Sequence, residues 1–234
     1  MSDEYGLGFL PSPPDPRDYP LELAPVIAPL PRRYVCPGMG PVLNQGSRPT
    51  CVAHAAAGLK TWEEKADRHG VIDFDREWLY ARCKETDGYP PGTPGTDGRS
   101  AMKVLRNLGC RAVNHPAAPA HFRIAAYYAV PLTLAAIKAA LMQYGPICVG
   151  GDWYDPWFRP VKGILPPAAG PVVGGHEQLV FGYDDDVAGG SLLVRGSWGL
   201  YVGSVNGNTY CPYNRYLPSL GEAWKALDLV GLPG

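Results

Sequence analysis

Cys51 opens a stretch with the pattern of a helix, and this start constrains the fold more than any other feature of the sequence. The helical run continues from Val52 to Lys60. Pro49 interrupts whatever precedes, and Thr50 is a possible N-cap. The unpaired N–H groups at a helix N-terminus favour an anion, so the placement is expected to lower the pKa of the Cys51 thiol. One residue is therefore both a predicted helix start and a candidate nucleophile.

A thiolate that attacks a carbonyl needs a base and donors for the oxyanion. His176, which follows two glycines far down the chain, is a candidate to move the proton. The side-chain amide of Gln45, together with the backbone N–H of Cys51, could hold the oxygen of a tetrahedral intermediate. This chemistry requires a fold that brings the two halves of the chain together.

These pieces resemble the papain-like cysteine peptidases, in particular their bacterial and viral members. The resemblance rests on four ordered segments: DPRDY at 15–19, PVLNQGSRPTCVA at 41–53, GGHEQLVFGY at 174–183 and LVRGSWG at 193–199. Four motifs in order are more specific than any one of them. The resemblance extends from about Asp15 to about Leu217.

The resemblance implies an α+β, papain-like two-lobe fold. A helical lobe is expected over about 45–121 and an antiparallel β lobe over about 122–234, with the active-site cleft between them. Residues 1–31 are rich in proline and are predicted to form an extended arm, which leaves 32–234 as the peptidase domain.

Local patterns agree with helices first and strands later. Helices are predicted from Cys51 to about Arg68, over 74–82, over 100–108 with Ser100 as cap, and over 132–144 with Thr133 as cap. Strands are predicted at 147–149, 177–182, 191–195 and 210–216, with a turn at 184–190.

The resemblance also assigns roles. Cys51 is the expected nucleophile, His176 the proton carrier, Gln45 an oxyanion donor and Trp198 a shield for the histidine. Asp97–Gly98 is the segment expected to pair with a substrate backbone.

Gly150, Gly175 and Glu177 are expected at the substrate subsites. A carboxylate of Glu177 near Gly150 would favour a basic substrate side chain. The alternative is a solvated glutamate at the rim of the cleft.

One position departs from the family in a way that bears on activity. The asparagine that orients the catalytic imidazole is replaced by Gly196, which has no side chain. Loss of an orienting group in an analogous triad costs about four decades of rate, and a smaller loss is expected where that group is neutral.

Three functions follow from these residues. The first is a cysteine endopeptidase that works through a Cys–His dyad and a thioester acyl-enzyme. The second, motivated by Gly196, is a weakened relative that binds peptide segments. The third is an acyl transferase or deamidase with the same dyad. The expected partner is a polypeptide. The arm is expected either to block the cleft from within the chain or to form a strap over the two lobes.

Composition narrows the remaining classes. Hydrophobic residues make up 46% of the 234 residues and the net charge is −1, which argues against a nucleic-acid binder. No apolar run is long enough for a membrane span and no secretory signal is visible, so a cytoplasmic location, or export by another route, is expected. No cofactor is expected.

The remaining cysteines and histidines have simpler interpretations. If Cys51 is the nucleophile, five cysteines remain, and an odd number suits free thiols. Cys83, Cys110, His115 and His121 lack paired metal-ligand spacing, so no metal site is expected. His54 is either a substitute base or, as we favour, a histidine at the edge of the core.

Overall fold

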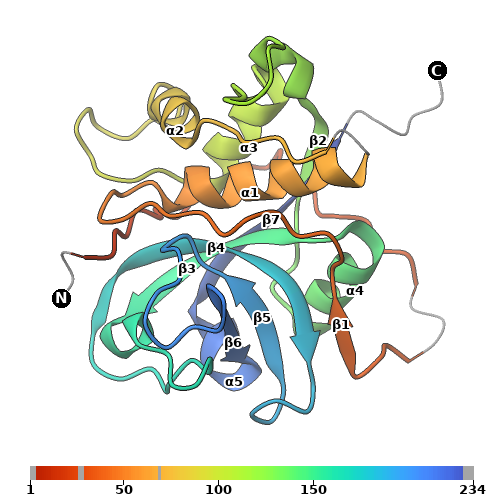
Figure 1. The fold of residues 1–234 in the computed structure, drawn as a ribbon, viewed down its shortest axis with the longest axis vertical. Helices are drawn as coiled ribbons and strands as arrows, with labels where there is room; N and C mark the ends of the chain where they lie inside the picture. Colours follow the sequence, from red (N-terminus) through yellow and green to blue (C-terminus); the bar gives the residue numbers. More distant parts are fainter. Residues whose placement is uncertain (1–3, 26–28, 68–69, 229–234) are drawn as a thin grey trace.

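A computed structural model describes residues 4–25, 29–67 and 70–228, and its helices and strands fall into two parts (Figure 1). The sequence predictions at 1–3, 26–28 and Arg68 lie outside the described residues. The helices are α1 (Cys51–Ala66), α2 (Arg76–Lys84), α3 (Gly98–Asn107), α4 (Leu134–Tyr144) and the short α5 (Tyr213–Tyr216). The strands are β1 (Arg33–Val35), β2 (Ile124–Ala129), β3 (Ile147–Tyr154), β4 (Val172–Asp184), β5 (Ser191–Arg195), β6 (Asn208–Pro212) and β7 (Leu220–Asp228).

The strands form one antiparallel sheet in the order β2-β7-β3-β4-β5-β6. The short strand β1 pairs with the C-terminal end of β4. The strand β4 is the longest and lies between β3 and β5. In Figure 1 the sheet curls below α1, whereas α2 and α3 lie above it. The α+β two-part architecture is as expected.

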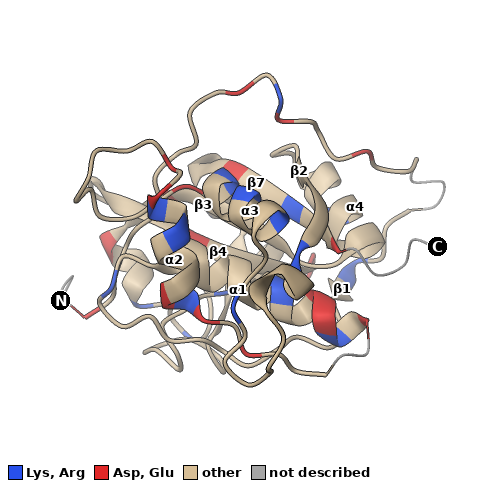
Figure 2. Cartoon of the chain, turned by 90° about the horizontal axis from the view of Figure 1, so that it is seen from above, with Lys and Arg blue, Asp and Glu red and all other residues tan. Residues whose placement is uncertain are grey.

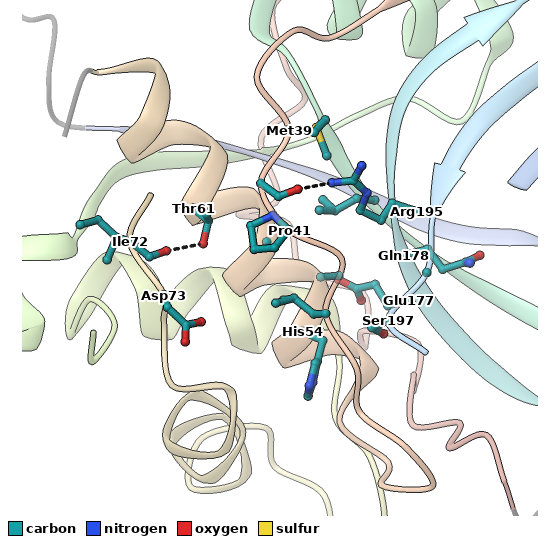
Figure 3. Close-up of a pocket in the computed structure, with 16 residues that line it drawn as sticks. Met39, Pro41, His54, Thr61, Ile72, Asp73, Glu177, Gln178, Arg195 and Ser197 are labelled. Carbon is teal, nitrogen blue, oxygen red and sulfur yellow. Dashed lines mark hydrogen bonds between the residues drawn. The ribbon is translucent and has the colours of Figure 1, made fainter. Parts of the chain in front are cut away.

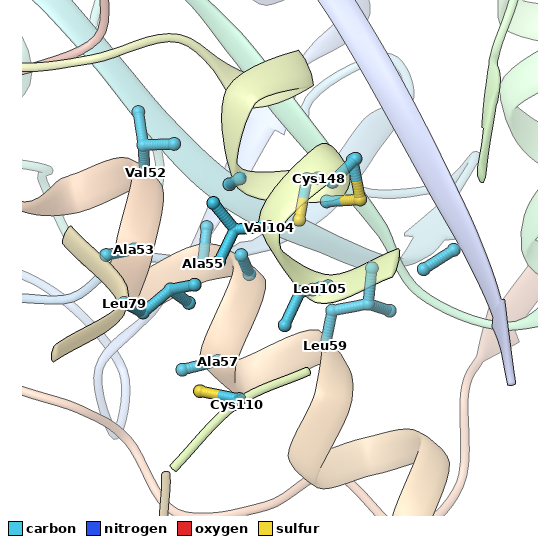
Figure 4. Close-up of a cluster of buried hydrophobic side chains, with 14 of the residues drawn as sticks. Val52, Ala53, Ala55, Ala57, Leu59, Leu79, Val104, Leu105, Cys110 and Cys148 are labelled. Atoms are coloured by element: carbon cyan, nitrogen blue, oxygen red, sulfur yellow. The ribbon is translucent and has the colours of Figure 1, made fainter. Parts of the chain in front are cut away.

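The core between helices and sheet is built on small side chains. Alanines along α1 let the helix approach its neighbours closely, and Leu59, Leu79 and Leu105 fill the space between α1, α2 and α3 (Figure 4). Cys148 of β3 extends this cluster to the sheet. A second buried cluster, around Trp153 and Trp198, fills the inside of the curled sheet. The site lies where the two clusters meet.

Helix ends show where local chemistry was correctly predicted and where it was not. Thr133 caps α4, since its Oγ1 accepts the backbone N–H of Ala136 at 3.2 Å. The predicted cap Ser100 is wrong: Asp97 caps α3, and Ser100 donates its N–H to that carboxylate at 2.9 Å. A carboxylate three residues upstream is a stronger acceptor for the free N–H groups than a hydroxyl inside the first turn.

The strand prediction fails at the C-terminal end. The predicted strand over 210–216 ends at Pro212, where the chain turns into α5. The last strand, β7, was not predicted, and α2 begins two residues later than the 74–82 pattern suggested, with Asp75 as its cap. A proline that cannot donate to a ladder is a physical reason for the early end of β6.

The six cysteines are all buried and unpaired. In the described part of the chain, no helix combines the length and apolar character needed to cross a membrane. Acidic and basic residues are interspersed along the helices (Figure 2).

Candidate active site

The predicted nucleophile and base lie on neighbouring elements. Cys51 is the first residue of α1, and α1 packs along β4, the strand that carries His176. The backbone N–H of Glu177, the residue after His176, is among the groups that favour the Cys51 thiolate and act to lower its pKa. Cys51 is 0% exposed and His176 is 2% exposed. The fold thus places the sulfur against the strand segment that holds the imidazole.

The imidazole is held by aromatic rings. The ring of His176 stacks on Trp198 with centroids 4.1 Å apart and an interplanar angle of 10°, and Trp153 meets it edge-on at 5.0 Å. Within the described residues, neither ring nitrogen of His176 has a hydrogen-bond partner. Trp198 therefore covers the histidine as predicted, while nothing described fixes its tautomer.

The N-terminal arm explains why both groups are buried, because it runs through the site as an extended strand. The N–H groups of Gly8 and Phe9 donate to the carbonyl of Gly175 at 3.1 and 3.0 Å. The N–H of Leu10 donates to the carbonyl of Thr96, and the N–H of Thr96 donates to the carbonyl of Gly8, both at 2.9 Å. The arm therefore pairs with both sides of the site at once.

A carbonyl of the arm accepts a hydrogen bond from the side chain of Gln45, the predicted oxyanion donor. The side-chain amide of Gln45 donates to the carbonyl of Gly6 at 3.1 Å and to that of Arg48 at 2.7 Å. The indole N–H of Trp198 donates to the same Gly6 carbonyl at 3.2 Å. Ser197 donates its hydroxyl to Gln45 Oε1, which fixes the amide orientation. Gln45 thus presents its N–H to a backbone carbonyl beside Cys51.

The arm fits closely because two of its residues lack side chains. A Cβ at Gly6 would lie 2.0 Å from the carbonyl oxygen of Arg48, and one at Gly8 would lie 2.2 Å from that of Pro49. Any side chain at either position would push the arm away from the loop before Cys51.

Burial reverses the expected electrostatics of the pair. It raises the pKa of the Cys51 thiol to about 12, although the backbone N–H groups of Glu177, Gly8 and Val52 oppose the shift. It also lowers the pKa of His176 to about 3. The prediction that the helix start lowers the pKa of Cys51 is therefore wrong for this arm-covered state, since removal from water outweighs the helix N-terminus. Both groups are neutral here.

A slot between two acidic residues lies beside the pair. Gly150 on β3 is directly paired with Glu177 on β4 and with Glu222 on β7. Directly paired residues project to the same face of a sheet, so the missing side chain of Gly150 leaves a gap between the two carboxyl groups. The ring of Phe9 fills this gap: a Cβ at Gly150 would lie 2.2 Å from it. We call Gly150, Glu177 and Glu222 the acidic slot.

The two carboxyl groups differ in their partners. Glu222 accepts the N–H groups of Ser12 and Gly98, each at 2.9 Å. Glu177 is 0% exposed, and neither of its oxygens has a partner among the described residues. Burial raises the pKa of both carboxyl groups, and it raises the pKa of Glu177 well above its usual value. The interpretation of Glu177 as a solvated rim residue is therefore wrong.

The arm pairs with the residue next to Asp97–Gly98, the segment predicted to pair with a substrate. Thr96, not Asp97–Gly98, forms the ladder with the arm. Asp97 is committed to the cap of α3 and also accepts the hydroxyl of Ser12 at 2.9 Å. Gly98 borders the acidic slot, since a Cβ there would come within 3 Å of both Glu177 and Glu222.

His54 is not a substitute base. It is 2% exposed, and its Nδ1 is bonded to the carbonyl of Thr50 at 2.9 Å. It lines a cavity between α1, the loop before Cys51 and the end of β5, where Arg195 donates to the carbonyl of Gly40 (Figure 3). This supports the core-edge interpretation.

Phe9, Thr96 and Glu222 were missed by the sequence analysis. A Gly-x-Gly-Phe run at 6–9 in a proline-rich arm was the available signal for the first. Within the described residues, no three histidine, cysteine, aspartate or glutamate side chains form a group able to hold a metal ion.

Comparisons with known proteins agree with this architecture. Xylellain, a cysteine protease from Xylella fastidiosa, is 25% identical, with 97% of each chain covered and a TM-score of 0.84. Digestive procathepsin L 3 from the larval midgut of Tenebrio molitor is 17% identical over 97% of this chain and 76% of its own, with a TM-score of 0.74. The second likeness is one of fold alone.

A curated relative adds a local match in sequence. A gut-specific cysteine proteinase of Caenorhabditis elegans is 31% identical over 83 residues, which is 36% of this chain and 25% of that protein. The match thus spans about a quarter of that relative, and no protein-family model matches the chain. By its fold, its ordered motifs and these relatives, the chain is papain-like and similar to the cysteine peptidases over almost its full length.

Proposed function

We propose that the chain is a cysteine endopeptidase whose N-terminal arm occupies the cleft until it is displaced. The observation that carries this proposal is the carbonyl of Gly6, which accepts the side-chain amide of Gln45 at 3.1 Å beside the buried Cys51. A peptide backbone is therefore already held where an acyl-transfer site would hold its substrate. The cysteine-protease relatives support the same chemistry.

The mechanism begins when the arm leaves. Water and the N-terminus of α1 then stabilise the thiolate of Cys51, and His176 takes the thiol proton. The sulfur attacks the carbonyl carbon, and the oxyanion is held by Gln45 and by the N–H of Cys51. The imidazolium protonates the leaving amine, and the imidazole then activates the water that hydrolyses the thioester.

The acidic slot indicates which class of substrate the site would bind. Phe9 places an apolar ring over Gly150, and Glu177 beside it has no partner among the described residues. A lysine or arginine side chain in the same gap would pair with these carboxylates. The proposed substrate is thus a polypeptide with a basic residue at the position that enters the slot.

The direct test is labelling of Cys51 in the full chain by an electrophilic peptide probe, located by mass spectrometry. We expect slow labelling in the parent and at least about tenfold faster labelling in Phe9→Ala, because the ring anchors the arm. Cys51→Ala is the matched control and should not react at the site. No labelling of Cys51 in either form, near neutral pH, contradicts the proposal.

A second candidate is a peptide-binding relative without turnover. It is favoured by Gly196 and by the absence of partners for the ring nitrogens of His176 among the described residues. Peptide binding and Cys51 labelling without hydrolysis would identify it. Transfer to an added amine, or release of ammonia from glutamine side chains, would instead identify the transferase or deamidase activity.

A further inference from the structure

The chain lacks a side chain at the position that should orient the catalytic histidine, yet that space is not empty. A Cβ at Gly196 would lie 3.3 Å from Nε2 of Gln178 and 3.7 Å from Cε1 of Tyr201. The nearer of these atoms belongs to a carboxamide. The position of the missing asparagine is therefore bordered by the same chemical group from a different residue.

Gln178 shares a strand with His176, although in this arm-covered state neither ring nitrogen of His176 has a hydrogen-bond partner among the described residues. The two residues are two apart on β4, so their side chains leave the same face of the strand. The neighbouring ladder pair, Leu179 with Arg195, brings the start of the Gly196 segment alongside Gln178. Gln178 is 2% exposed, which excludes competition from bulk water for its amide.

The amide is held from behind. The hydroxyl of Tyr216 donates to Gln178 Oε1 at 3.0 Å, and Tyr216 is itself 3% exposed. This leaves Nε2 directed toward Gly196. A phenol can also accept, so the amide can turn over and present Oε1 instead.

We propose that Gln178, held by Tyr216, is a positioning residue for His176 and takes the place of the asparagine absent at 196. This inference rests on the proposed function. A neutral imidazole nitrogen can accept from the amide N–H, and the imidazolium N–H can donate to the amide oxygen once the amide has turned. Gln178 acts through His176 and does not touch the substrate.

The test moves the carboxamide between the two positions. Gln178→Val is expected to lower kcat about tenfold or more with little change in KM, and to narrow the pH range over which Cys51 reacts with iodoacetamide. Gly196→Asn alone should gain nothing, because Gln178 fills the space. The double variant Gln178→Val with Gly196→Asn should recover most of the lost rate.

Two further variants separate positioning from packing. Tyr216→Phe removes only the hydroxyl and should lower kcat by about threefold. Asn114→Val removes a carboxamide that bonds to the backbone of Val71 and Asp73, outside the arm and the site, and should leave the rate unchanged. An equal rate and an unchanged pH profile in Gln178→Val overturn the inference.

A readout independent of turnover keeps this separate from the proposed function. The ring ¹⁵N signals of His176, recorded in Cys51→Ala, should shift when Gln178 is replaced by valine, because the tautomer balance changes. Unchanged signals also overturn the inference. Failure of Cys51 to react in the parent would instead overturn the peptidase proposal.

Discussion

Two groups of buried ionisable residues lie against α1, and they differ in whether each charge meets an opposite charge. Near the C-terminal end, Lys60 is fully buried between Glu64, at 2.6 Å, and Asp228, and Lys225 contacts Glu63 at 3.4 Å. We call these five residues the ion cluster. Near the N-terminal end, the acidic slot holds two carboxyl groups around a gap that the arm fills.

The difference separates structure from function. In the ion cluster each charge meets the opposite charge of the fold itself, so α1 is tied to β7. In the acidic slot no cation from the described residues pairs with Glu177, and Arg99 is engaged by Asp15 and Asp18 of the arm. A buried group left without a partner is costly, and proteins keep such groups where a ligand completes them.

The largest effect should come from breaking the ion cluster. Lys60→Met removes the cation shared by Glu64 and Asp228, and should lower the free energy of unfolding by about 3–5 kcal/mol. Urea denaturation measures the loss. Lys65→Met, on the exposed face of the same helix, is the control and should change little. A loss below about 1 kcal/mol would remove the contrast between the two groups.

The pH dependence of the acidic slot should come next. Because burial raises the pKa of Glu177, its contribution to stability is full below the ordinary value of 4.5 and is lost as the pH rises through the raised value. Glu177→Gln should therefore gain on the parent above pH 4.5, by up to about 1.4 kcal/mol per pH unit.

Thermal melting of the parent and of Glu177→Gln, from about pH 4 to about pH 8, measures this difference in stability. His176 shifts in the opposite sense, since its pKa is lowered to about 3, and its contribution is present above 6.5 and lost as the pH falls. Both proteins contain His176, so its contribution cancels in the difference between their stabilities. Parallel profiles would show that Glu177 is already paired.

A cation placed in the acidic slot should convert it toward the ion cluster. Phe9→Arg puts a guanidinium between Glu177 and Glu222, and should slow labelling of Cys51 by about tenfold at neutral pH. Phe9→Leu, an apolar control, should not slow it. If arginine loosens the arm as much as alanine does, the slot does not select cations.

The smallest effect should come from an exposed pair. Arg32 and Asp186 form an ion pair with side chains 73% and 64% exposed. Arg32→Ala should change the free energy of unfolding by less than about 0.5 kcal/mol, because water screens the pair. The same urea titration measures it. A larger loss would mean that pairing, and not burial, distinguishes the ion cluster.

The sequence predicted the parts of the site that depend on local pattern. The helix start at Cys51 and the strand at 191–195 are confirmed by the structure, and the rings of His176 and Trp198 are stacked. Each follows from a motif or a turn within a few residues, although the side chain of Thr50, the predicted cap, makes no hydrogen bond to α1. The roles of Cys51 and His176 in catalysis stay predictions.

What the sequence could not supply depends on distant contacts. Burial raises the pKa of Cys51, and one of the backbone groups that oppose the shift belongs to Gly8, more than forty residues away. Glu222 lies on β7, whose alanine, lysine and aspartate residues give no strand pattern because the buried Lys225 contacts Glu63 and Trp62 instead of water. The place of the carboxamide at Gln178 follows only from strand register.

The attachment of the arm to the domain it covers has a kinetic consequence. Phe9 and Cys51 belong to one chain, so the blocking peptide is present at an effective concentration on the order of millimolar, whatever the protein concentration. A free substrate at micromolar levels has to bind roughly a thousandfold more tightly to compete with it. A single cleavage of the chain between Phe9 and Cys51 would remove this advantage, and the arm would then dissociate on dilution.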